Sequence, residues 1–99
     1  MRSYEKALAE LQNTVRLAPD LAQAHSDLGE LLAAMGRTDR AAEQYELAIQ
    51  SNPAQYAAHL ALGGILARTG RTAEARLHFE RAAQSTDPAV RQAALAAMR

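Results

Sequence analysis

Three histidines and a few acidic pairs are the side chains of this sequence best suited to chemistry. His25 and His59 recur in the same sequence context, and imidazole can bind a metal ion or exchange a proton near neutral pH. On stacked helices such a pair would lie roughly 8–10 Å apart, too far to share a zinc ion whose bonds to nitrogen are about 2 Å long. We therefore predict that His25 and His59 are partly buried structural residues and that His78 lies on the surface.

Acidic pairs such as Glu43 and Glu46 could serve general acid–base catalysis only if they converged in a cleft with shifted pKa values. On a helix they are more simply a solvated face. The sequence contains no nucleophile–histidine–acid set, no His-Glu-x-x-His motif and no phosphate-binding glycine loop, and it has no Cys. We expect no enzymatic activity, no cofactor and no metal.

Composition and charge narrow the class of partner. Alanine, the strongest helix former, fills 24 of 99 positions, whereas Gly and Pro are few. Eleven basic residues balance eleven acidic ones, with a sum of −3 over residues 1–50 and +3 over residues 51–99. Because the basic residues are scattered, we expect no nucleic acid and no membrane as a partner. The longest uncharged run, residues 47–67, is too polar to span a bilayer, so we expect a soluble chain without a signal or transmembrane segment.

A tandem repeat organises the chain. Residues 22–55 and 56–89 are identical at 14 of 34 positions without a gap. The identities include His25/His59, Leu28/Leu62, Gly29/Gly63, Gly36/Gly70 and Ala41/Ala75. A fixed period of this length indicates an array in which each unit buries its apolar face against its neighbours.

Capping signals predict the ends of the helices. We expect Ser3 to cap a helix over 4–17, Asp20 with Gln23 to open the next helix, and Asn52 to cap a helix from Pro53. Thr38 and Thr72 are expected to cap further helices, and Asp87 with Pro88 a last one. Gly36 and Gly70 are expected to stop the helices before them. One domain results, divided into 3–18, 20–52, 53–86 and 88–99.

These motifs resemble the tetratricopeptide repeat (TPR). The first unit reads His25-x2-Leu28-Gly29-x2-Leu32, then Ala41-x3-Tyr45, Ala48 and Pro53, and the second repeats the pattern through Phe79 and Ala82. The resemblance implies an all-α, right-handed solenoid of antiparallel helical hairpins, here two full repeats flanked by half-repeats. We expect Gly29 and Gly63 to allow close helix approach and Tyr45 and Phe79 to fill gaps between hairpins.

The same resemblance implies a non-catalytic module that binds a peptide or partner protein in a concave groove. The groove would be polar and acidic in its first half and apolar in its second, which suits a ligand with a basic group near Asp27 and Glu30. Its expected lining is Gln23, Ser26, Asp27, Glu30, Ala33, Ala57, Leu60, Ala61, Gly64 and Arg68.

The alternative is a structural segment that forms homo-oligomers through its open helical ends. In that case the residues in contact would be Leu8, Val15, Val90 and Met98. The last helix can be interpreted in three ways, as a continuation of the repeats, as a cap, or as the start of a HEAT-like array. The partner, the compartment and the parent protein are not determined by the sequence.

Overall fold

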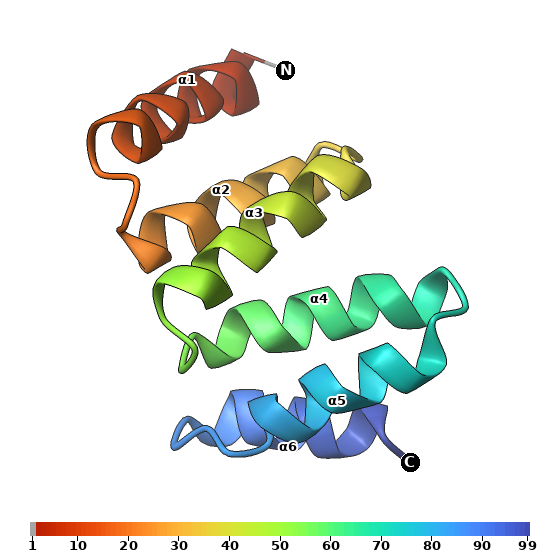
Figure 1. Ribbon diagram of the computed structural model, residues 1–99. Coiled ribbons are helices and arrows are strands. Elements are labelled where there is room, and N and C mark those ends of the chain that lie inside the picture. The colour runs from red at the N-terminus through yellow and green to blue at the C-terminus, as the bar shows by residue number, and fades with distance from the viewer. Residues whose placement is uncertain (1) are drawn as a thin grey trace.

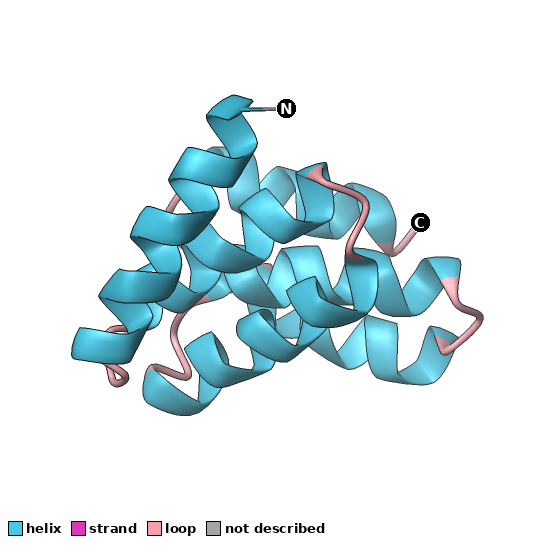
Figure 2. Cartoon of the chain, turned by 90° about the horizontal axis from the view of Figure 1, so that it is seen from above, coloured by secondary structure: helices cyan, strands magenta, loops and turns pink. Residues whose placement is uncertain are grey.

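The computed structural model describes residues 2–99, which form helices joined by short loops (Figures 1 and 2). No strand occurs within residues 2–99, so the all-α prediction is confirmed. The helices in this range are α1 Arg2–Leu17, α2 Ala22–Ala34, α3 Thr38–Ser51, α4 Tyr56–Arg68, α5 Thr72–Ala82 and α6 Pro88–Ala97.

The helices stack in chain order as hairpins. The most extensive packing joins α2 to α3 and α4 to α5, and smaller contacts join α1 to α2, α3 to α4, and α6 to both α5 and α4. Figure 1 shows the resulting stack, which runs from α1 at one end to α6 at the other. The molecule is thus a helical-repeat solenoid of two hairpins, with one further helix at each end.

In each hairpin, one glycine ends the first helix, as predicted. Gly36 and Gly70 have φ angles of 80° and 83°, a left-handed conformation that costs little only for glycine. After α2, the Gly36 N–H donates to the Ala33 carbonyl at 3.0 Å and the Arg37 N–H donates to the Leu32 carbonyl at 2.8 Å. This pair of bonds satisfies carbonyls that the helix end leaves free, and the same pair recurs after α4.

Two other glycines set the distance between the helices of a hairpin. A Cβ atom on Gly29 would lie 2.8 Å from Cε1 of Tyr45, and one on Gly63 would lie 2.7 Å from Cε1 of Phe79. Both distances are shorter than any ordinary carbon–carbon contact. The predicted close approach is confirmed. Tyr45 and Phe79 were expected to fill gaps between hairpins, whereas each ring lies on the glycine of its own hairpin.

The core runs through both hairpins and closes on the terminal helices. It includes Leu28, Leu32, Tyr45, Leu62, Leu66 and Phe79, and the apolar residues Leu8, Leu11, Val15 and Met98 pack against it from the ends. Three of the residues predicted for self-association, Leu8, Val15 and Met98, therefore already have partners within the chain. Val90 is half-buried.

Several predicted caps are wrong. Leu21, Arg37 and Arg71 occupy the positions before α2, α3 and α5, and none of them caps its helix with a side chain. Thr38 and Thr72 are the first helical residues instead, and α1 already begins at Arg2, before Ser3. The predicted cap at Asp20 is wrong as well, because α2 has Leu21 at its N-cap position and no side-chain hydrogen bond caps it within residues 3–99.

The prediction for Asn52 is also wrong, because residues 53–55 form a turn before α4 begins at Tyr56. The Asn52 side chain accepts a hydrogen bond from the Ala54 N–H at 3.0 Å and so stabilises that turn. The cap at Asp87 is confirmed, since its carboxylate accepts from the Ala89 N–H at 3.0 Å with Pro88 as the first helical residue.

Candidate protein-binding surface

Equivalent positions on α2 and α4 form two outward strips of very different chemistry. Residues spaced by four, three and four positions share one side of a helix. On α2 these are Gln23, Asp27, Glu30 and Ala34, and all four are exposed. On α4 the equivalents are Ala57, Ala61, Gly64 and Arg68, of which the two middle residues are half-buried.

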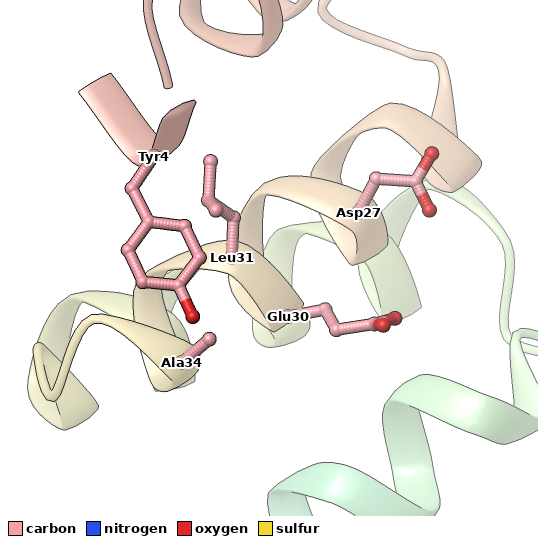
Figure 3. A pocket seen from close by; sticks show the side chains of 5 residues that line it. All are labelled: Tyr4, Asp27, Glu30, Leu31 and Ala34. Carbon is pink, nitrogen blue, oxygen red and sulfur yellow. The ribbon is translucent and has the colours of Figure 1, made fainter. Parts of the chain in front are cut away.

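An acidic hollow lies where α1 meets the α2 strip. It has a volume of about 360 Å³ and is lined by Tyr4, Asp27, Glu30, Leu31 and Ala34. Figure 3 shows the Tyr4 ring over the C-terminal part of α2, near Leu31 and Ala34, with Asp27 and Glu30 on the preceding turns. The hollow thus joins one aromatic ring, a small apolar wall and two carboxylates.

The two carboxylates of the hollow have no cationic partner among the side chains of residues 3–99. The ion pair found within that range joins Arg71 to Glu74, at 2.8 Å between Nη2 and Oε2. Asp27 accepts a hydrogen bond from Gln23 Nε2 at 2.9 Å, and Gln23 Oε1 accepts from Gln55 Nε2 at 3.0 Å. The acidic charge of the hollow is therefore available to an external cation.

The negative charge of Glu30 also acts on Tyr45 in the core. Burial raises the pKa of the Tyr45 phenol, and the negative charge of Glu30 adds to that rise. Both causes favour the neutral phenol. Tyr45 therefore stays uncharged at physiological pH.

The α4 strip offers a smooth surface instead. Ala57, Ala61 and Gly64 bring only small or absent side chains, and Arg68 follows one turn later. A Cβ atom on Gly64 would meet only Arg68 Nη1, at 3.9 Å. The arginine thus folds back toward the glycine and covers it in part.

Some of the predicted groove residues are less accessible in the structure than expected. Ser26 is only 6% exposed, so its hydroxyl is not offered to a ligand, and Leu60 is partly buried against the core. Both residues sit beside the outward strips rather than on them. Ala33 is exposed but does not line the hollow.

Sequence reasoning missed Tyr4 and Leu31 as lining residues. Leu31 was hidden because it is simply one more apolar residue of an amphipathic helix. Tyr4 had a visible signal, since the equivalent places in the two following units carry Thr38 and Thr72. An aromatic residue at a position that is Thr in the other two units indicates a feature that is specific to this first helix.

Two histidines are buried, and all three are hydrogen-bonded through their rings. His25 and His59 are 6% and 7% exposed, as expected of structural residues. The prediction that His78 lies on the surface is wrong, because His78 is half-buried and its Nδ1 lies 3.0 Å from Nδ1 of His59. Its position is set by the pairing of α4 with α5, which helix periodicity alone does not reveal.

Residues 2–99 contain neither a metal-binding cluster nor a membrane-spanning helix. No three His, Cys, Asp or Glu side chains in this range lie close enough together to hold a metal ion. None of the helices in the same range has the length and apolar character needed to cross a membrane.

Comparisons with known proteins agree with this geometry. A family model described as tetratricopeptide repeat matches residues 1–54 and again 26–90. Among solved structures, the crystal structure of MamA is similar, with a TM-score of 0.76 and 30% sequence identity over 81% of this chain. The match spans 47% of the MamA chain, so this chain covers about half the length of that protein. No curated protein sequence matches.

Proposed function

Because this chain belongs to the tetratricopeptide repeat family, whose repeats mediate protein–protein interaction, we propose that it binds a segment of a partner protein along the α2 and α4 strips. The observation that carries the proposal is the acidic hollow, which places two carboxylates without a cationic partner among residues 3–99 beside the half-buried ring of Tyr4. The family is a non-catalytic one, and the proposed role requires no chemistry.

The hollow suits a Lys or Arg side chain of the partner. Asp27 and Glu30 would neutralise its charge, and the Tyr4 ring would cover its aliphatic stem or stack on a guanidinium. Charge pairs at an exposed site contribute little each, so recognition would rest on the two carboxylates acting together.

The α4 strip suits the part of the ligand beyond the basic residue. Without large side chains at Ala57, Ala61 and Gly64, a ligand backbone or small apolar side chains can approach the helix closely. Arg68 would then favour an acidic group or a carbonyl at the far end. The proposed ligand is therefore basic at the α2 strip and apolar at the α4 strip. Self-association through the helical ends stays a prediction.

Two labelled synthetic peptides of equal length test the proposal, one composed of Lys, Ala and Leu and the other of Glu, Ala and Leu. We expect the Lys peptide to bind more tightly. The double variant Asp27→Asn with Glu30→Gln should weaken its binding by roughly 2- to 30-fold, as expected for the loss of two exposed charge pairs.

The matched control is Asp39→Asn with Glu43→Gln, which removes the same charge from two exposed residues of α3. This control should bind the Lys peptide as the unchanged chain does. Equal binding of the two peptides, or an equal loss in both double variants, would show that the acidic hollow is not the site.

A further inference from the structure

The two hairpins place different side chains opposite their buried histidine. His25 on α2 faces Gln44 on α3, and His59 on α4 faces His78 on α5, with the same sequence separation of 19 in both cases. Each histidine also contacts the carbonyl of a proline before its helix, with Nε2 of His25 2.7 Å from the Pro19 oxygen and Nε2 of His59 3.0 Å from the Pro53 oxygen. The two hydrogen-bond contacts of each histidine are thus equivalent except for the side chain across the hairpin.

The contacts of His59 fix which nitrogen carries each proton. A carbonyl oxygen only accepts, so Nε2 of His59 donates to Pro53 and Nδ1 of neutral His59 carries a lone pair. His78 must then donate its Nδ1–H to that lone pair across 3.0 Å. In the neutral pair one hydrogen atom bridges two nitrogens and joins α4 to α5.

Ring geometry favours this hydrogen bond over a shared metal ion. The ring centroids are 5.2 Å apart, which is close to the sum of the 3.0 Å N···N distance and two ring radii. The rings therefore meet almost head-on, with each Nδ1 directed at the other. Two ligands of one metal ion would instead direct their nitrogens at a common point to one side.

Protonation affects this pair in two steps. A first added proton can be taken up at Nε2 of His78, and one N–H still bridges the two Nδ1 atoms. A second proton puts an N–H on both Nδ1 atoms, so two donors and two positive charges face each other across 3.0 Å and must separate. The first hairpin does not have this conflict between two donors. The amide of Gln44 can turn either its oxygen or its NH2 group toward His25, so it can pair with a neutral or a protonated ring.

Some neighbouring groups lower the pKa values of the two histidines, and others raise them. Burial is the main cause that lowers the pKa values of His59 and His78. The hydrogen bond to the Pro53 carbonyl opposes the change at His59, whereas His78 and Arg81 on α5 add to it. At His78 the carboxylates of Glu46 on α3 and Glu74 on α5 oppose the change. Arg71, which is paired with Glu74, lines a second hollow between the hairpins together with His78 and Glu46.

We propose that the His59–His78 pair is a proton-sensitive link between α4 and α5, which loosens the second hairpin on acidification and has no counterpart in the first. The inference goes beyond ligand binding and does not depend on it.

The direction of the effect follows from proton uptake. Because both pKa values are lowered in the folded chain, the unfolded chain binds more protons as the pH falls below 6.5, the ordinary value of histidine. The stability that the two neutral histidines contribute is therefore complete above pH 6.5. It is lost as the pH falls from 6.5 toward the pKa values of the folded chain. Each histidine that is neutral when folded and charged when unfolded lowers the folding equilibrium constant about tenfold per pH unit in that window.

Urea unfolding of the whole chain at pH 7.5 and pH 5.0 tests the proposal with two variants. His78→Gln copies the first hairpin into the second, and Gln44→His copies the second into the first. Relative to the unchanged chain, we expect the loss of stability between the two pH values to be smaller in His78→Gln and larger in Gln44→His. Equal losses in all three chains would overturn the proposal.

A second measurement reads the pair in the unchanged chain and does not depend on how the variants fold. Long-range 1H–15N NMR spectra at pH 7.5 should show His59 protonated at Nε2 and His78 protonated at Nδ1. On acidification the pair should take up its first proton below pH 6.5 and its second at a clearly lower pH, with both rings responding to each step. Independent titration at or above pH 6.5, or a proton on Nδ1 of His59 at pH 7.5, would overturn the proposal.

Discussion

The first and second hairpins share a frame and differ in what they add to it. Two glycines of the first unit and two of its small alanines recur at matching positions of the second, and Tyr45 and Phe79 lie on their glycines in the same way. The matching pairs are Gly29/Gly63, Gly36/Gly70, Ala41/Ala75 and Ala48/Ala82. They differ on the outward strip and at the partner of the buried histidine. The repeat thus fixes how the helices approach each other, and leaves a few positions free to set charge and proton sensitivity.

The largest expected effect comes from removing the aromatic rings. Tyr45→Ala and Phe79→Ala should each destabilise the chain by about 3–5 kcal/mol, because each ring is almost fully buried, at 4% and 6% exposure. Urea unfolding at pH 7.5 measures both. Since the two rings fill equivalent spaces, a clear difference between the variants would contradict the equivalence of the hairpins.

A smaller effect is expected from the glycines. Gly29→Ala and Gly63→Ala should each cost about 1–3 kcal/mol, because the added methyl group overlaps a buried aromatic ring and outweighs the better helix propensity of Ala.

Gly64→Ala is the matched control on the same helix as Gly63. Its Cβ would meet only the end of Arg68, so we expect a gain of about 0.5–1 kcal/mol from helix propensity. Thermal unfolding of the three variants separates the cases. A gain in stability for Gly63→Ala would show that the ring can move aside.

The smallest expected effect sharpens the comparison of the two rings. Tyr45→Phe gives the first hairpin the ring of the second, and we expect a change within about 0.5 kcal/mol. The Tyr45 hydroxyl makes no hydrogen bond within residues 3–99 and is not a fully buried atom without a partner, so its removal leaves no polar atom stranded. Unfolding at pH 7.5 measures it, and a loss above about 1 kcal/mol would mean that the hydroxyl has a structural role.

The repeat, the hairpins and the close helix approach at Gly29 and Gly63 were predictable, because each follows from residue types that recur at a fixed offset. The helix starts were less predictable. Asn52 is a good cap in general, but the proline after it begins a turn, and the same side chain stabilises either structure. Local signals at Asp20 and Asn52 could not show which alternative packing would favour.

The contacts across a hairpin were beyond the sequence for a different reason. His78 points inward only because α5 pairs with α4 in a register that puts residues 59 and 78 opposite each other. Tyr4 reaches the hollow only through the way α1 packs on α2. Neither arrangement follows from the period of a single helix, although the equal separation in His25–Gln44 and His59–His78 becomes clear once one hairpin is known.

The amide chain from Gln55 through Gln23 to Asp27 has a consequence for the entropy of binding. Asp27 is held in one rotamer by a side chain that is itself held from the next repeat, so it loses little rotational freedom when a cation arrives. Glu30, on the next turn of the same helix, has no hydrogen bond that orders it among residues 3–99. Of the two equal charges, Asp27 is therefore preorganised, and Glu30 must be ordered by the ligand.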